Sequence, residues 1–290
     1  MIDKKNKVLD CNDIINKFDQ DKNYRYLSNP TTPADFNDLN CRIAYLLDQL
    51  INTENYLNIM DLSEEMNVSR GTVNNDLRKT KKLLRKYNAE ILGVTNKGIK
   101  LKCSEFSKRL VLIYEVFDYF QCNILIDNKT INLLEALADY YKLDNQMELL
   151  FYKSTIVTID RLKKGMALKN PIPMYKNFEI YSKELKGFIM EIENIYKIEL
   201  NYEDVDFISF PINTRNSAHT GNIENTVNQE MLLQIVKQML DSIRERYMID
   251  VNVKAFYSKV RYHLLFLINR LIFRIPVNDI FPTKSKLDFH

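Results

Sequence analysis

The chain has 290 residues, 46% hydrophobic and 27% charged, and its 41 Lys and Arg residues nearly balance its 38 Asp and Glu residues. The resulting net charge of +3 excludes a histone-like or polybasic protein, while the length and the apolar content suggest two to three domains. Only six glycines occur, which favours a mostly helical protein. The N-terminus has no signal-peptide pattern, and no run approaches about 18 apolar residues. We therefore expect a cytoplasmic protein that does not cross a membrane.

The sequence lacks the short motifs of the common enzyme and metal-binding classes. There is no phosphate-binding glycine loop, no GxSxG and no dinucleotide-binding turn. The cysteines form no CxxC pair, and no histidine lies at ligand spacing from any of them. We therefore expect no catalytic residues, no metal, no cofactor and no disulfides. The cysteines are Cys11, Cys41, Cys103 and Cys122.

Two amphipathic helices follow a polar lead-in. Residues 1–37 end in a turn-rich stretch at 28–33, which indicates a linker. Residues 39–52 then have apolar side chains at helical spacing, and a second helix is expected over 59–66. The spaced positions of the first helix are Ile43, Leu46, Leu47, Leu50 and Ile51.

A third helix and a hairpin complete this part of the chain. Ser69 is placed to cap the helix, whose buried face is set by Val73, Leu77, Leu84 and Tyr87. Two β-prone segments, 90–95 and 99–103, are joined by Asn-Lys-Gly and predict a hairpin. Helix, helix, short turn, helix and hairpin is the order of a winged helix-turn-helix, and it predicts such a domain over residues 38–104.

Positive charge is concentrated in residues 69–102. Ten basic residues there face only Asp76 and Glu90, a net charge of +8 over 34 residues, which leaves −5 on the remainder of the chain. Such asymmetry is typical of a module that binds double-stranded DNA attached to a regulatory body. A basic run is also typical of a solvated helix without a ligand, and it is the surrounding helix order that favours DNA.

The spacing of the third helix selects the candidate contacts. With Val73 and Leu77 facing inward, arginine and asparagine side chains project outward, where they can pair with guanine and adenine. Lysines farther along suit phosphates, and the hairpin tip can reach the backbone or an adjacent groove. The predicted DNA-binding residues are Ser69, Arg70, Thr72, Asn74, Asn75, Arg78, Lys82 and Lys97.

Beyond residue 104 the pattern is helical and contains a repeat. Interruptions are expected at 170–173 and at Pro211, and the polar stretch 213–222 suits a linker. Residues 154–162 align with residues 263–271 at an offset of 109, without a gap. The repeat predicts two tandem helical domains, 105–221 and 222–290, of which the second is incomplete.

At this point the sequence resembles a known family. The segment DLSEEMNVSRGTVNNDLRKTKKLLRKYNAEILGVTNKGIKLKCSE resembles the second winged helix of the BglG/Mga-like transcriptional regulators. The two repeat units resemble their phosphotransferase-system regulation domains (PRDs), and the resemblance covers residues 28–290. It implies a mainly α fold, a winged helix-turn-helix followed by one helical-bundle PRD and a partial second one, apparently truncated at both ends. It also implies a homodimeric regulator of carbohydrate uptake and metabolism genes, controlled by phosphocarrier proteins of the phosphotransferase system.

Only one of the PRD positions carries the histidine that the resemblance implies. Ser154 and Pro211 stand where the first PRD would carry its two histidines, so we expect that domain to be structural or dimerising. His263 stands at the first histidine position of the second PRD and is the predicted phosphorylation site, because a neutral imidazole nitrogen accepts a phosphoryl group. A half-buried helix residue is the plainer interpretation of His263.

Two other functions stay open at this stage. The chain could be a truncated interaction module that dimerises with a longer regulator without binding DNA. RNA antitermination is conceivable from the resemblance, but that branch uses a small β-rich RNA-binding domain, and residues 1–60 show no such strand pattern.

Overall fold

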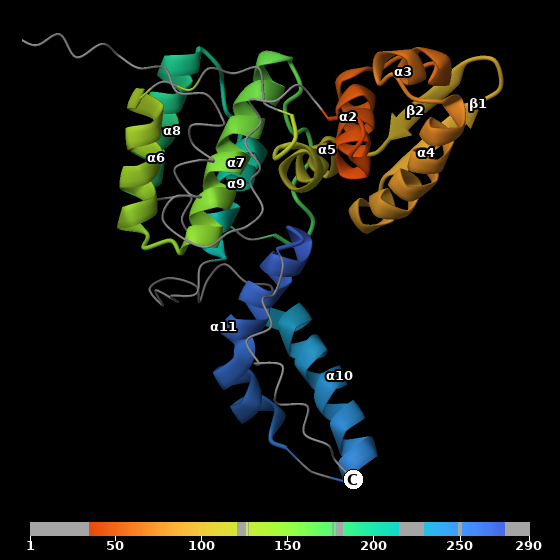
Figure 1. Cartoon of the computed structure of the whole chain (residues 1–290). Helices are drawn as coiled ribbons and strands as arrows, with labels where there is room; N and C mark the ends of the chain where they lie inside the picture. Colours follow the sequence, from red (N-terminus) through yellow and green to blue (C-terminus); the bar gives the residue numbers. More distant parts are fainter. Residues whose placement is uncertain are drawn as a thin grey trace, which may run out of the picture. The chain divides into compact units, whose positions relative to one another are not determined.

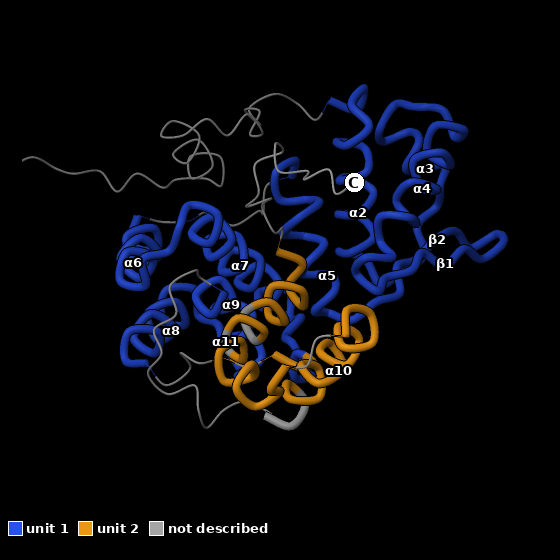
Figure 2. The backbone as a smooth tube through the Cα atoms, turned by 90° about the horizontal axis from the view of Figure 1, so that it is seen from below, with its two compact units in different colours: residues 1–172, 179–215 blue, residues 173–178, 216–290 orange. Residues whose placement is uncertain are grey.

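The computed structural model describes residues 35–120, 126, 128–175, 177, 182–214, 229–248 and 251–275. The chain divides into two compact units (Figure 2), the first of residues 1–172 and 179–215 and the second of residues 173–178 and 216–290. The described part is mainly helical, as the sequence predicts. The predicted lead-in before residue 35 and most of the predicted linker, residues 215–222, lie outside it.

The first unit begins with the predicted winged helix-turn-helix order (Figure 1). Each helix starts at a side-chain cap, because the oxygens of Asp38, Asn58 and Ser69 accept hydrogen bonds from backbone N–H groups of the first turn. The elements are α2 (Leu39–Asn52), α3 (Ile59–Glu65), α4 (Arg70–Leu84), the 3₁₀ turn η1 (Arg85–Tyr87), β1 (Glu90–Val94) and β2 (Gly98–Lys102).

The strand bounds differ from the prediction by one residue, and β2 ends at Lys102 and not at the predicted Cys103. Val94 pairs with Gly98 in the antiparallel register, so β1 ends one residue before the predicted Thr95 and β2 begins one residue before the predicted Ile99. The amide of Lys97 donates to the carbonyl oxygen of Val94 at 3.0 Å, and Asn96 has a positive φ of 62°. These features close a tight turn that Asn and Gly tolerate well.

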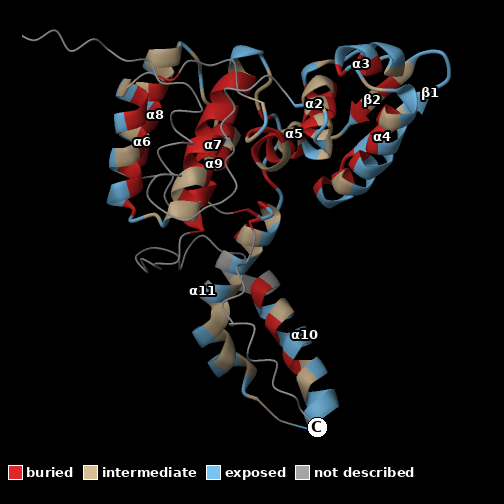
Figure 3. Ribbon diagram, viewed as in Figure 1, coloured by how far each residue is buried: buried red, intermediate tan, exposed pale blue. Residues whose placement is uncertain are grey.

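A helical body completes the first unit. Its central helix is α7, in which every residue from 150 to 161 is buried (Figure 3), and α7 packs along α9. A helix buried on all sides forms the core of a bundle. The elements are α5 (Glu105–Val111), the π-helical turn η2 (Leu112–Val116), α6 (Asn128–Tyr140), α7 (Asn145–Lys163), α8 (Lys183–Tyr196) and α9 (Tyr202–Asn213).

Pro211 does not interrupt the helical pattern, contrary to the sequence-based expectation. It lies inside α9, which continues to Asn213. Proline removes one backbone donor from a helix, but near the C-terminal end few later bonds depend on it. Side chains satisfy carbonyls in this stretch, since Ser154 donates to Ile208 at 3.0 Å and Thr214 donates to Phe210 at 2.9 Å. The expected interruption at 170–173 is present as non-helical chain.

The second unit contains α10 (Gln229–Tyr247) and α11 (Val253–Ile272), which pack against each other. α7 ends at Lys163 and α11 ends at Ile272, 109 residues later, which is the offset of the sequence repeat, and the tandem-domain organisation stays a prediction. The domain boundaries at residues 104 and 221 remain predictions. No helix in the described ranges is both long and apolar enough to cross a membrane.

Candidate nucleic-acid interface

α4 has one buried face and one exposed polar face. The buried face consists of Val73, Asp76, Leu77, Thr80 and Leu84. The predicted contact residues lie away from it and are exposed, except for Thr72, which is half-buried. The exposed members are Ser69, Arg70, Asn74, Asn75, Arg78, Lys82 and Lys97.

The N-terminus of α4 is organised by the two predicted hydroxyls. Ser69 Oγ accepts a hydrogen bond from the Thr72 amide at 3.0 Å, and the Oγ atoms of the two residues lie 2.9 Å apart. Ser69 therefore acts first as the helix cap, as predicted. The free amides and the dipole of a helix N-terminus attract anions such as DNA phosphates.

Arg78 and Asn75 are neighbours on the exposed face. Arg78 Nη1 donates to Asn75 Oδ1 at 3.2 Å. The bond restrains two flexible side chains that each can make paired hydrogen bonds to a base edge. Asn75 and Arg78 share the exposed face of α4 with Arg70 and Asn74.

The hairpin is attached to the helices by a third extended segment that the sequence did not predict. Leu57 and Ile99 exchange two backbone hydrogen bonds of 2.8 Å each, which bridges the α2–α3 connection to β2. A β-prone pair, Tyr56-Leu57, is the one local signal that could have suggested it. A Cβ at Gly98 would come within 2.1 Å of the Leu57 carbonyl oxygen, so only glycine fits beside this bridge. The bridge fixes the base of the hairpin whose tip carries Lys97.

The end of α4 is tied to the π-helical turn. Glu115 in η2 accepts a hydrogen bond from the hydroxyl of Tyr87, in the η1 turn that follows α4. The Glu115 carboxylate also forms an ion pair with Lys86 of η1, with 2.6 Å between Lys86 Nζ and Glu115 Oε1. π-Helical turns are rare and often occur at functional positions. Here the turn presents Glu115 to the residues that follow the candidate recognition helix.

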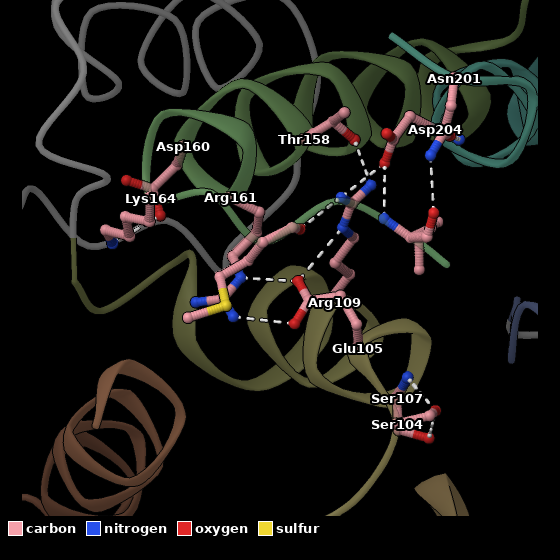
Figure 4. A network of polar contacts seen from close by, with 12 residues as sticks. Ser104, Glu105, Ser107, Arg109, Thr158, Asp160, Arg161, Lys164, Asn201 and Asp204 are labelled. Atoms are coloured by element: carbon pink, nitrogen blue, oxygen red, sulfur yellow. Dashed lines mark hydrogen bonds and ion pairs between the residues drawn. The ribbon is translucent and has the colours of Figure 1, made fainter. Parts of the chain in front are cut away.

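A largely buried network of charges links α5, α7 and α9 within the first unit (Figure 4). Glu105 of α5 accepts two hydrogen bonds from Arg161 of α7, at 2.7 and 2.8 Å. Arg161 also donates to Asn52, the last residue of α2, at 3.4 Å, and Lys164 donates to the same oxygen at 3.0 Å. The sequence predicted none of these pairs.

A second buried arginine extends the network into α9. Arg109 Nη2 pairs with Asp204 Oδ1 at 2.6 Å, and both side chains are fully buried. Burial lowers the pKa of Arg109, and it raises the pKa of Asp204 although Arg109 beside it acts in the opposite direction. Arg109 also donates to the carbonyl oxygen of Met166 at 3.0 Å. These ties pair buried charges with one another and with a backbone carbonyl, while the second carboxylate oxygen of Asp204, Oδ2, has no hydrogen-bond partner in the described part of the chain.

The predicted histidine positions differ in accessibility. His263 is exposed on α11, so the half-buried interpretation does not hold. Ser154 is fully buried and its hydroxyl donates to the carbonyl oxygens of Phe151 and Ile208. Pro211 is buried in α9. Within the described residues no group of three or more His, Cys, Asp or Glu side chains could hold a metal ion.

The winged-helix region is similar to known regulatory proteins. Residues 35–117 match the Mga helix-turn-helix domain. The chain is also similar to the "Probable licABCH operon regulator" of Bacillus subtilis (strain 168), with 30% identity over 93 residues. That alignment covers 32% of this chain and 14% of the relative. The chain therefore carries a Mga-type helix-turn-helix domain, which implies DNA binding, and it is distantly similar to an operon regulator.

The matched region extends beyond the hairpin. It includes all of α5 and η2 and ends at Phe117. The helix that carries Glu105 and the turn that carries Glu115 therefore belong to the Mga-type domain by sequence, while they pack against α7 of the helical body. The contacts between α5–η2 and α7 are thus contacts between the Mga-type domain and the rest of the first unit.

Proposed function

We propose that this protein is a sequence-specific regulator of transcription that reads double-stranded DNA with α4 and contacts the backbone with its hairpin. The observation that carries the proposal is the exposed face of α4, on which Arg70, Asn74 and Arg78 project from a domain of the helix-turn-helix class. Arginine pairs with guanine and asparagine with adenine in the major groove. The basic residues of the region supply the sequence-independent attraction.

The contacts divide by chemistry. Arg70, Asn74, Asn75 and Arg78 lie within the first nine residues of α4, toward the N-terminal part that reaches base edges in helix-turn-helix proteins. Lys82 lies one turn beyond Arg78 and Lys97 lies at the hairpin tip, where each suits a phosphate. Ser69 caps α4 by accepting the Thr72 amide, and the N-terminal end of the helix dipole there suits a further phosphate.

The regulatory part of the proposal concerns the helical body. We propose that the chain controls genes of carbohydrate uptake and metabolism as a homodimer that places two winged helices on paired half-sites. Phosphocarrier proteins of the phosphotransferase system modify His263, whose exposure on α11 permits access. A phosphoryl group would add nearly two negative charges to that surface. The buried Ser154 has no accessible hydroxyl and takes no part in this transfer.

Selection from a pool of random duplexes tests DNA reading. The full chain is expected to enrich a common sequence and to bind it with an affinity that falls steeply as salt rises. Equal retention of all duplexes, or no retention at low salt, would contradict the proposal. If the chain retains no duplex at low salt but copurifies with a longer homologue, the interaction-module alternative is favoured.

Incubation with a phosphotransferase cascade tests the regulatory site. Acid-labile phosphate should appear on the wild-type chain and be lost in His263→Ala. The matched controls are His219→Ala and His290→Ala, which should retain the label. Label that persists in His263→Ala at the wild-type level removes His263 as the sole acceptor.

A further inference from the structure

Asp76 is an acidic residue in the most basic segment of the chain, yet it is not part of the exposed face of α4. It is 2% exposed and lies on the buried face with Val73 and Leu77. Its carboxylate meets Arg42 of α2, with 2.6 Å between Arg42 Nε and Asp76 Oδ2 and 3.4 Å between Arg42 Nη2 and Asp76 Oδ1. A carboxylate directed away from solvent and held by two guanidinium nitrogens is an anchor for the helix.

Arg42 holds more than Asp76. Its remaining terminal nitrogen, Nη1, donates to the carbonyl oxygens of Phe36 and Asn37, at 2.7 and 3.0 Å. One guanidinium therefore joins the chain that enters the domain, the first helix and the candidate recognition helix. The planar fork of arginine has the geometry for such paired bonds, and lysine lacks it.

The other contacts of α4 fix how closely the helix packs on the domain core better than they fix its rotation about its own axis. Val73, Leu77 and Leu84 are aliphatic, and apolar packing is non-directional. Side chains extend roughly 5–6 Å from a helix axis, so a rotation of about 20° would move an exposed group by about 2 Å. Hydrogen bonds to a base edge do not survive such a shift, because their lengths vary only between about 2.7 and 3.2 Å. Phosphate contacts by flexible lysines would persist.

We propose that Arg42 and Asp76 are positioning residues that set the rotation of α4, and thereby determine which duplex sequence the exposed face accepts. The inference rests on the proposed DNA-reading function and deepens it. The pair touches no base. It acts through Arg70, Asn74 and Arg78, whose placement depends on the rotation that the pair holds.

The substitution Asp76→Asn distinguishes a positioning role from a general electrostatic effect, because the two change DNA affinity in opposite directions. Asp76→Asn adds one positive charge to the domain, which by itself tightens binding to every duplex. Loss of positioning weakens binding only to the selected duplex. The readout is the ratio of the dissociation constants for an unrelated and a selected duplex of equal length at one salt concentration, measured by fluorescence anisotropy on the full chain.

We expect Asp76→Asn to lower that ratio about tenfold, the order of one lost paired base contact, while affinity for the unrelated duplex stays equal or rises. Glu64→Gln is the matched control, because it makes the same charge change at an exposed residue of α3. It should leave the ratio unchanged. Arg42→Lys keeps the charge but loses the fork, and it should lower the ratio as well.

Circular dichroism and the unfolding midpoint establish that each variant is folded. If Asp76→Asn does not fold, Arg42→Lys decides alone. A folded variant that retains the wild-type ratio overturns the positioning role and leaves the proposed function intact. A wild-type chain without preference for any duplex overturns the proposed function and this inference with it.

Discussion

Glu105 and Arg161 form a paired ion bridge between α5 and α7, and Arg161 reaches on to Asn52 at the end of α2. The arginine side chain is 1% exposed and the carboxylate 17%. Since α2 and α5 both belong to the Mga-type domain, this bridge joins that domain to α7, whereas the Lys86–Glu115 pair lies within the domain and links η1 to η2. The winged helix is thus packed against the helical body in one compact unit and is not a separate domain joined by a flexible linker.

Removal of the Glu105 charge should destabilise the first unit. Glu105→Gln leaves Arg161 buried without its carboxylate, and the loss of one partner of a buried pair costs about 3–5 kcal/mol. Urea unfolding measures the difference. Lys129→Gln is the control, because it breaks the exposed Lys129–Glu191 pair, which should cost less than about 1 kcal/mol. Equal losses in the two variants would show that burial of the Glu105 pair has no energetic consequence.

The hairpin attachment can be tested at one glycine. Gly98 has a φ of 108° and a Cβ there would collide with the Leu57 carbonyl, so Gly98→Ala should cost more than about 2 kcal/mol through strain and displacement of the bridge. Gly93→Ala in β1 is the matched control, since a Cβ there meets nothing within 4 Å, and it should change stability by less than about 0.5 kcal/mol. Thermal unfolding decides, and similar midpoints for both variants would contradict the close approach.

Asp48 should make stability depend on pH. Burial raises the pKa of Asp48, and Asp160 adds to this rise while Lys164 and Arg161 oppose it. Between the ordinary aspartate pKa of about 3.9 and the raised folded value, the folded chain holds a proton that the unfolded chain has released. This contribution to stability therefore declines as pH rises through that window.

Asp48→Asn removes this decline, and the amide oxygen can still accept the hydrogen bond that Asn52 donates. The stability of the variant relative to wild type should therefore increase as pH rises above about 3.9. Urea unfolding of both proteins at pH 4 and pH 7 provides the comparison. A difference that is independent of pH, or that shrinks as pH rises, would exclude the raised pKa as its cause.

Base-reading and phosphate-binding residues should respond differently to salt. Lys82→Gln should weaken binding to all duplexes alike and reduce the slope of log affinity against log salt by about 1. Arg78→Gln should cost about 1–3 kcal/mol on the selected duplex and relax its sequence preference. Titrations at several salt concentrations measure both effects. The assignment of Lys82 to a phosphate fails if its variant changes sequence preference instead.

Local sequence signals were sufficient to predict the helices and the hairpin of the winged helix. The cap at Ser69, the apolar spacing of Val73 and Leu77 and the turn at Asn96 each depend on neighbours a few residues away, and all three are present. The exposure of the candidate contacts followed from the same spacing. Their contact with DNA stays a prediction.

What the sequence did not predict depends on residues far apart in the chain. Arg42 and Asp76 are 34 residues apart and Glu105 and Arg161 are 56 apart, and no periodicity pairs such charges. Charge counting treated Asp76 as a partial offset to the basic run, whereas tertiary packing buries it. Pro211 shows the opposite error, because a strong local breaker is tolerated where side chains satisfy nearby carbonyls and the helix is about to end.

The most direct test of DNA reading by α4 compares two variants that lose the same charge. Arg70→Ala/Arg78→Ala removes two positive charges from the exposed face of α4, and Lys169→Ala/Lys183→Ala removes two exposed ones from the helical body. The measurement is the preference for a selected duplex over an unrelated one at fixed salt. If α4 reads DNA, the arginine variant loses that preference and the lysine variant keeps it. A folded arginine variant with wild-type preference would contradict the assignment of α4 as the reading helix.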